Sequence, residues 1–203
     1  MQLPVQYRQL IECFDALPGI GPRAAARMAQ HVLEHDSGER LQQAILTARK
    51  TLQHCCCCRT YSDLSICPLC TDDERSALHL LVVSGVEDQF RWEEAGYRGG
   101  YFVLHGLLSP VAGIGPRQLH LPDLKQRVET LVSAAESSSA ENLLVQVVLE
   151  SSVEADATGQ FIEDMLAGFA CRVQLLTPGQ LAVDLQHARS FSAADHVPAG
   201  ADK

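Results

Sequence analysis

Six of the eight cysteines in this 203-residue chain lie in one short segment, HCCCCRTYSDLSICPLC, which runs from His54 to Cys70. Two pairs in the segment have the C-x-x-C spacing, which turns the backbone sharply enough for both thiolates to reach one metal ion. Four protein thiolates complete a tetrahedron and leave no open position, so the spacing predicts a structural site and not a catalytic one. Thiolate ligands in a finger-like spacing favour zinc over iron. The predicted zinc ligands are Cys55, Cys58, Cys67 and Cys70.

The other thiols have different interpretations. Cys56 and Cys57 are interpreted as small, polarisable filler, with exchange for a ligand as the alternative. A redox dithiol cluster competes as an interpretation of the whole segment, but such pairs usually accompany a βαβ pattern, and this segment follows predicted helices. His54 is a weaker ligand candidate because four better-spaced thiols exist. Cys13 and Cys171 lie in apolar stretches and are expected in the core.

A second chemical motif is the glycine-rich stretch LPGIGPRAAARM, in which Gly19 and Gly21 permit a tight turn. A proline follows at the first predicted helical position, and the free backbone N–H groups of such a helix start suit a phosphate. Arg23 and Arg27 are four residues apart and would share one helix face. The pattern fits a helix-hairpin-helix element that contacts the DNA backbone without reading sequence, and it fits an ordinary helix–helix corner equally well.

The hydrophobic pattern changes along the chain and predicts the elements that position these motifs. Residues 5–53 have helical spacing. The apolar runs LHLLVV, YFVLH, LLVQVVL and CRVQLL have strand length and alternate with amphipathic stretches, which predicts an α/β fold with a mostly parallel sheet and flanking helices. We expect amphipathic helices at 87–96, 123–137 and 158–170. The predicted domains are a helical region at 1–53, a zinc finger at 54–72, an α/β domain at 78–178, and a C-terminal segment at 179–203 whose last part, RSFSAADHVPAGADK, is frayed.

Charge and hydropathy limit the class of function. The net charge is −9, and residues 81–203 carry sixteen acidic and eight basic side chains. Affinity for nucleic acid comes mainly from Lys and Arg. The excess of acidic residues therefore argues against tight DNA binding by this protein alone, and it predicts a local DNA contact near the N-terminus. No apolar run reaches the ~20 residues needed to span a bilayer. The first residues also lack the basic and apolar pattern of a signal peptide. The expected compartment is the cytoplasm, where thiols stay reduced and a metal is favoured over disulfides.

Several stretches, taken in order, resemble the RecR family of bacterial recombination mediators. They are LPGIGPRAAARMA, the paired C-x-x-C module with CRTYSD and ICPLC, the run YFVLHGLLSPVAGIGP, and SVEADAT at 152–158. The resemblance implies a helix-hairpin-helix, a zinc finger and a Toprim domain, in that order. It further implies a homo-oligomeric clamp around DNA, as a dimer or tetramer. RecO-like and RecF-like partners would then help it load RecA on single-stranded gaps in the nucleoid.

The chain departs from the family pattern at two places. The first Toprim strand usually ends in a glutamate, and Ser84 stands there, whereas Asp88 matches a family acidic position and Glu154 and Asp156 lie close to the second acidic site. The glycine-rich PxGGELE-like stretch is replaced by LLTPGQLAVDLQ. A Mg²⁺ site needs several hard oxygen ligands in near-octahedral geometry, so we interpret the acidic residues as a vestigial patch and the protein as a non-enzyme.

Three functions are therefore compared. The favoured one is a zinc-containing DNA-repair mediator without catalytic activity. The second is a Mg²⁺-dependent Toprim nuclease or strand-transfer enzyme, which would use the carboxylates of the acidic patch in phosphoryl chemistry. The third is a protein-interaction module that zinc stabilises and that has no role in DNA binding.

Overall fold

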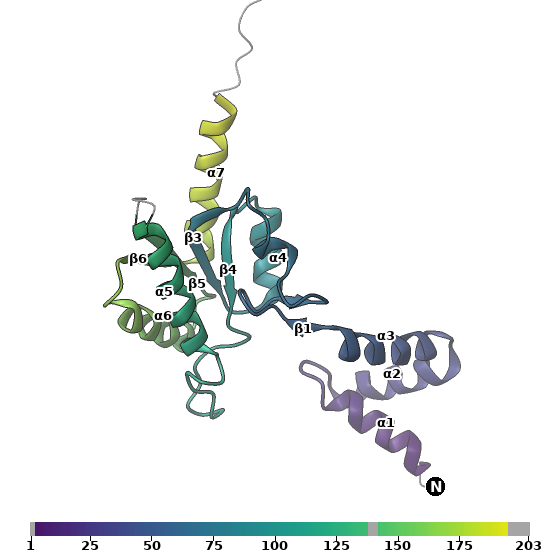
Figure 1. Ribbon diagram of the computed structural model, residues 1–203. Coiled ribbons are helices and arrows are strands. Elements are labelled where there is room, and N and C mark those ends of the chain that lie inside the picture. Colours follow the sequence, from purple (N-terminus) through teal and green to yellow (C-terminus); the bar gives the residue numbers. More distant parts are fainter. Residues whose placement is uncertain (1–2, 138–141, 195–203) are drawn as a thin grey trace, which may run out of the picture. The chain divides into compact units, whose positions relative to one another are not determined.

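The computed structural model describes residues 3–137 and 142–194. The chain divides into two structural units, Met1–Leu52 and Gln53–Lys203. The cysteine segment therefore belongs to the same unit as the α/β sheet. Figure 1 gives the elements of each unit.

The first unit consists of three helices, α1 (Val5–Asp15), α2 (Pro22–Glu34) and α3 (Ser37–Thr51). Helix α2 begins with Pro22 at its first position, as its sequence predicts, and Gly21 is its N-cap. Ala25 and Ala29 are fully buried on one face of α2. Small side chains at this spacing let the neighbouring helix α1 approach closely, so the alanine-rich sequence produces the packed α1–α2 hairpin.

The outer helices of this unit keep apolar side chains at the surface. Neither α1 nor α3 has a buried residue, and Leu41 and Ile45 of α3 are exposed. The expectation that Cys13 lies in the core is wrong, because its side chain is exposed. The partly covered residues of α1 recur at helical spacing, at 7, 10, 11 and 14, and position 13 lies off that face.

The second unit opens with a two-stranded antiparallel ribbon, β1 (Gln53–His54) and β2 (Tyr61–Ser62), followed by a 3-10 turn, η1 (Pro68–Cys70). A four-stranded sheet follows in the order β4-β3-β5-β6, and every neighbouring pair is parallel. The α/β fold predicted from the sequence is confirmed. Its strands are β3 (Ser76–Val83), β4 (Gly99–Val103), β5 (Leu143–Val148) and β6 (Cys171–Leu176).

Both faces of this sheet are covered, as Figure 1 shows. Leu80 and Val82 of β3 pack with α5 (Leu121–Ser137) and α6 (Val153–Leu166) in one core cluster. The alternate residues Leu81 and Val83 face the other side, where they pack with α4 (Val86–Glu94) and α7 (Pro178–Ala194). Successive strand residues point to opposite faces, so a sheet buried on both sides requires the continuous apolar runs seen in the sequence. Cys171 is partly buried against the α5–α6 cluster, which agrees with its predicted core position.

The C-terminal segment is more ordered than its composition indicates. Residues 189–194, expected to be frayed, belong to helix α7, whereas 195–203 lie outside the described residues. Helix α7 begins with a reciprocal cap: the Gln180 N–H donates to Thr177 Oγ1 (3.3 Å) and the Thr177 N–H donates to Gln180 Oε1 (2.8 Å). This is a capping box with Pro178 at the first helical position. Leu181 of the first turn is buried and holds α7 against the sheet.

An arginine that carries no sequence signal of its own joins three elements of this unit. Arg75, just before β3, has a buried side chain and donates to both carboxylate oxygens of Glu93 at 2.9 and 2.8 Å and to the Gly99 carbonyl at 3.0 and 2.8 Å. Tyr101 donates to the same carboxylate at 3.0 Å. Burial raises the pKa of Glu93, but the hydrogen bonds from Arg75 and Tyr101 outweigh it and leave this pKa below its ordinary value. The carboxylate therefore stays charged and ties the end of α4 to the start of β4.

We expect Arg75→Ala to lower the free energy of unfolding by about 3 kcal/mol, because it leaves a half-buried carboxylate without its main partner. Urea unfolding followed by circular dichroism measures this change. The matched control is Arg98→Ala, which removes a second arginine from the same Glu93 (3.0 Å) but at a side chain that is 65% exposed. That control should cost less than about 1 kcal/mol. Equal losses in the two variants would contradict the assignment of Arg75 as the main partner.

Candidate metal centre and nucleic-acid surfaces

The four predicted ligand cysteines lie together. Their sulfur atoms are all within 4.8 Å of one another, and Cys58 Sγ and Cys67 Sγ are 3.4 Å apart. The first knuckle is closed by the Arg59 N–H, which donates to the Cys55 carbonyl at 2.9 Å. The second is closed within η1, where the Cys70 N–H donates to the Cys67 carbonyl at 3.0 Å. Two local turns therefore aim all four thiols at one point.

The donor set fits one tetrahedral metal ion. A Zn–S bond length of ~2.3 Å places tetrahedral sulfurs a little under 4 Å apart, close to the observed spacing. Cys55, Cys58 and Cys67 are buried, so four thiols without a metal would fill a core position with weak donors. Among residues 3–137 and 142–194, this is the only group of three or more Cys, His, Asp or Glu side chains that converges in this way. A metal held here would supply folding energy to a ribbon whose strands are only two residues long.

The ligand cysteines differ in pKa because of their hydrogen bonds and burial. A hydrogen bond from the Cys58 thiol is the main cause that lowers the pKa of Cys70, to about 5. The same hydrogen bond, with burial, raises the pKa of Cys58. Arg127 on α5 lies near Cys70, its Nη1 3.9 Å from the sulfur, and its positive charge also favours the thiolate. The surroundings therefore favour the thiolate at Cys70, whereas burial raises the pKa of Cys67 to about 11.

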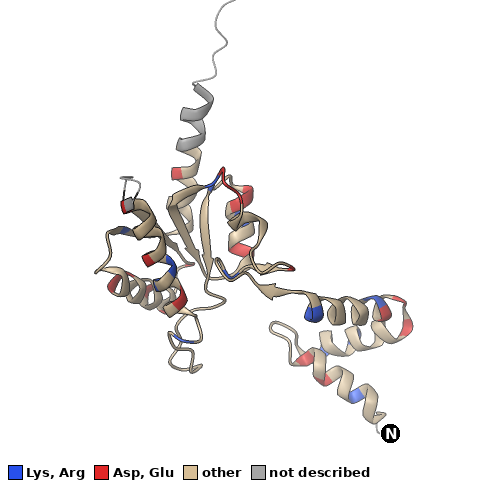
Figure 2. Cartoon of the chain, in the orientation of Figure 1, with Lys and Arg blue, Asp and Glu red and all other residues tan. Residues whose placement is uncertain are grey.

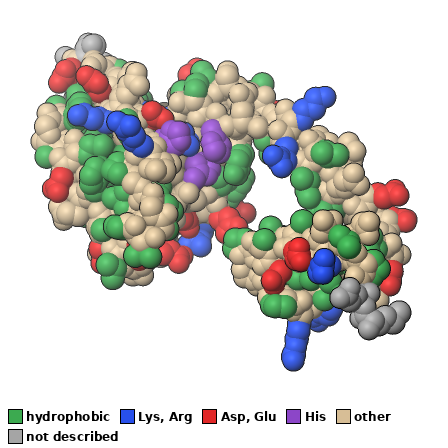
Figure 3. Space-filling model, turned by 90° about the horizontal axis from the view of Figure 1, so that it is seen from below, with side chains coloured by type: hydrophobic (Ala, Val, Ile, Leu, Met, Phe, Trp, Pro, Cys, Tyr) green, Lys and Arg blue, Asp and Glu red, His purple; other side chains and the backbone are tan. Residues whose placement is uncertain are grey.

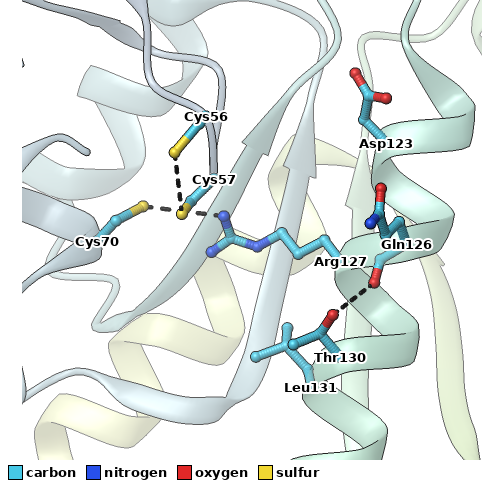
Figure 4. Close-up of a pocket in the computed structure, with 8 residues that line it drawn as sticks. All are labelled: Cys56, Cys57, Cys70, Asp123, Gln126, Arg127, Thr130 and Leu131. Carbon is cyan, nitrogen blue, oxygen red and sulfur yellow. Dashed lines mark hydrogen bonds between the residues drawn. The ribbon is translucent and has the colours of Figure 1, made fainter. Parts of the chain in front are cut away.

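Cys56 and Cys57 do not belong to the group of four converging thiols. Figure 4 shows both side chains at a cavity of about 500 Å³ that also contacts Gln126, Arg127 and Thr130 of α5. Their sulfurs are 3.9 Å apart, and burial raises the pKa of Cys57 to about 12. Cys57 is half-buried and packs against the buried cluster that contains the ligand cysteines, as small filler would, whereas Cys56 is exposed.

The predicted DNA-contact residues lie on one exposed part of the first unit. Gly19 has φ of 77°, a conformation that other residues rarely adopt, and it makes the turn between α1 and α2. Gly21 is the N-cap of α2. Arg23 and Arg27 are exposed, because α2 turns its other face, with the buried alanines, towards the hairpin. The backbone donors of a helix start and two arginines are therefore accessible together.

The predicted acidic residues do not all converge. Asp88 and Glu154 line one cavity of about 860 Å³ at the ends of the sheet strands, and Ser84 lines it with them. Asp156 lines a different cavity, next to Thr177 and Gln180. Both Glu154 and Asp156 lie in the first turn of α6, where acidic side chains stabilise the helix through its dipole. Their local role in helix α6 is sufficient to explain their sequence positions.

An arginine that sequence reasoning missed lies among these carboxylates. Arg91 Nη1 is 3.6 Å from Asp88 Oδ1 and 3.3 Å from Glu150 Oε1. Ser84, where the family pattern has a glutamate, donates a 2.5 Å hydrogen bond to Asp88. The charge of Asp88 is therefore already balanced by protein groups. The pair of Asp88 and Arg91 has a local signal, because the two residues are three apart on one helix. The contact of Arg91 with Glu150 has none, because it joins positions 59 residues apart.

These features define a class of protein with a helix-hairpin-helix, a four-cysteine metal module and a Toprim-like sheet. The family model described as "RecR, helix-hairpin-helix" matches residues 7–49, and the model described as "Toprim domain" matches residues 79–142. The "Recombination protein RecR" of Pseudomonas putida (strain W619) is 41% identical over 162 residues, which cover 79% of this chain and 77% of that protein.

The chain belongs to the RecR family. Within the described residues, no helix has both the length and the apolar character needed to cross a membrane.

We expect Cys67→Ser to lose its metal, because three thiolates and a hydroxyl cannot complete the tetrahedron. Losing even ~3 kcal/mol of the roughly 10–16 kcal/mol that a structural ion contributes would lower the melting temperature by about 6–12 °C. Plasma mass spectrometry gives the metal content and calorimetry the melting temperature. Cys56→Ser and Cys57→Ser are the matched controls and should keep one ion per chain. An unchanged metal content in Cys67→Ser would show that the ligand set is wrong.

Proposed function

We propose that this protein is a DNA recombination and repair mediator without catalytic activity. It binds single-stranded or gapped DNA without reading sequence, as a homo-oligomeric clamp in the cytoplasmic nucleoid, and assists RecA loading together with RecO-like and RecF-like proteins. The observation that carries this proposal is the exposed helix start on α2, with Arg23 and Arg27, in a chain that belongs to the RecR family.

The metal in this proposal is zinc with a structural role. Four thiolates suit a soft or borderline ion in a tetrahedron. The four protein ligands also fill its coordination sphere, so the bound ion has no open position for substrate or water.

The charge balance supports a clamp over a single tight contact. The net charge is −9, and acidic positions are spread over α4, α5 and α6 of the second unit (Figure 2). Few cations per chain give weak binding, since each neutralised phosphate contributes separately. Several hairpins acting on one DNA molecule raise the overall affinity through effective concentration. The exposed apolar side chains of α3, including Leu41, Ile45 and Leu46, are available for contact with another copy of the chain.

The proposal that the Toprim-like sheet is not catalytic rests on its strand ends. Ser84 cannot supply the carboxylate that a catalytic Mg²⁺ site needs, and Asp156 lines a cavity separate from that of Asp88. Arg91 holds a positive charge beside Asp88 and Glu150. A guanidinium at this place opposes the binding of a divalent cation.

For DNA binding, we expect Arg23→Ala/Arg27→Ala to weaken affinity for gapped DNA by at least about tenfold. The slope of log affinity against log salt should become shallower by about one for each phosphate that the variant no longer neutralises. Fluorescence anisotropy at several salt concentrations measures both values. Arg8→Ala/Arg40→Ala removes the same charge from elsewhere in the first unit and serves as the control. Equal losses in the two double variants would contradict a specific hairpin contact.

For catalysis, we expect no cleavage of labelled single-stranded or gapped DNA when the pure protein is incubated with Mg²⁺. The physical reason is the incomplete carboxylate set around Ser84. Gel analysis of the labelled DNA measures this. Metal-dependent cleavage that Glu154→Ala abolishes, while Asp156→Ala retains it, would overturn the non-enzyme proposal and identify the cavity with Asp88 as the active site.

A further inference from the structure

A cluster of three aromatic rings lies on the second unit, and the metal centre does not account for it. His54 and Tyr61 are directly opposite each other in the β1–β2 ribbon, with ring centroids 5.0 Å apart. His105, which follows β4, stacks on His54 at 4.4 Å with 25° between the ring planes. Tyr61 meets His105 edge-on at 5.5 Å. We call these residues, His54, Tyr61 and His105, the ring cluster.

The backbone around the ring cluster is unusual. Among the described residues, three that are not glycine have positive φ: Arg59 (66°), His105 (60°) and His120 (53°). One of them, His105, belongs to the ring cluster and hydrogen-bonds to the Arg59 carbonyl, while Arg59 and His120 contact the same carboxylate, that of Asp123. Side chains in this conformation cost free energy and persist where the surrounding structure fixes them. Their concentration at one place marks a site that is held in a defined shape.

Specific contacts hold this shape. His105 Nε2 donates a 2.7 Å hydrogen bond to the Arg59 carbonyl, which joins the strand end to the metal-binding knuckle. Asp123 of α5 accepts from His120 Nδ1 at 2.9 Å and lies 3.8 Å from Arg59 Nη1. His105 is therefore held in place by hydrogen bonding, and His54 and Tyr61 pack their rings against it. A site that is held in place loses little conformational entropy on binding.

The ring cluster is accessible. Tyr61 is 56% exposed, His54 is exposed and His105 is half-buried. Figure 3 shows histidine side chains gathered in one surface patch. Tyr61 and His105 also line the cavity of about 860 Å³ that contains Asp88 and Glu154. That volume is large enough for one flat, ring-shaped group.

We propose that the ring cluster is a stacking platform for a nucleobase of single-stranded DNA. This inference rests on the proposed DNA-binding function and adds a second contact, separate from the hairpin. Every base has an aromatic face, so stacking on protein rings binds single strands without reading sequence. In a duplex the same faces are covered by neighbouring bases, so the platform selects unpaired DNA.

The charges near the cluster favour a base over a free phosphate. The adjoining cavity is lined by four carboxylates and by one guanidinium, that of Arg91. This excess of negative charge repels an anion, whereas the carboxylates accept hydrogen bonds from the exocyclic amines of bases. The four are Glu87, Asp88, Glu150 and Glu154. The nearby Arg59 side chain is only 12% exposed and already pairs with Asp123. Attraction at this place therefore comes from ring faces, while the phosphate contacts belong to the hairpin.

The test compares two oligonucleotides of equal length and charge, oligothymidylate and an abasic strand of the same sugar-phosphate backbone. We expect the full-length protein to bind oligothymidylate more tightly. Tyr61→Ala should weaken that binding at least about fivefold, the lower end for one stacked base, and should leave abasic binding unchanged. Tyr61→Trp should restore or strengthen it. Phe90→Ala removes an aromatic side chain that is 64% exposed on α4 and is the matched control.

The outcomes separate this inference from the proposed function. If Arg23→Ala/Arg27→Ala weakens both strands while Tyr61→Ala weakens neither, the hairpin contact stands and the platform is refuted. If Tyr61→Ala weakens both strands equally, its effect is not base stacking and the platform is also refuted, with metal content and melting temperature reporting any loss of fold. If the wild-type protein binds neither strand, both proposals fail. Photocrosslinking of 5-iodouracil to Tyr61 or His105, mapped by mass spectrometry, would support the platform directly.

Discussion

The four-cysteine cluster is the constraint on which the second unit depends. Cys55, Cys58 and Cys67 belong to the same buried cluster as the β3 and β4 side chains that face α4 and α7. The Val103 N–H at the end of β4 donates to the Cys58 carbonyl at 2.9 Å, so the first knuckle continues the hydrogen bonding of the sheet edge. The sequence alone predicts the metal module as a finger between two domains. In the structure it is part of the α/β core, and closing the tetrahedron fixes the edge strand as well as the ribbon.

Fixing that edge also places the surface groups around it. The residue after the second ligand, Arg59, takes a left-handed conformation, and its carbonyl receives the hydrogen bond from His105. The ribbon that carries the ligands carries His54 and Tyr61 on its exposed side. One short segment thus has a buried face whose four cysteines suit a metal ion and an outer face that presents rings. Loss of the metal would disorder both, and for this reason the proposed platform is tested with substitutions that leave the ligands intact.

Sequence reasoning predicted what depends on local spacing. Strand runs, the paired C-x-x-C turns and Pro22 at a helix start each carry their signal within a few residues, and the parallel α/β fold is confirmed. Features that depend on distant residues were missed: Arg91 meets Glu150, and Arg75 meets Glu93 and Gly99, only because the sheet order brings them together. The capping box of Thr177 and Gln180 is different, because its signal is local but coincides with the stretch where the chain departs from the family's glycine-rich motif. Cys13 was misplaced because an apolar neighbourhood in sequence does not give the direction of one helical side chain.

The strand ends show how a Toprim-like edge can remain acidic without a divalent cation. Carboxylates gathered at one edge repel each other unless something balances them. Here Arg91 is shared between Asp88 and Glu150, Ser84 donates to Asp88, and the start of α6 stabilises Glu154 and Asp156. One guanidinium offsets only part of this charge, and because Glu87 lines the same cavity the edge keeps a net negative charge. An acidic edge also repels the DNA backbone. A single strand that reaches this face must therefore approach with its bases, and the rings of Tyr61 and His105 stand at the rim of that same cavity.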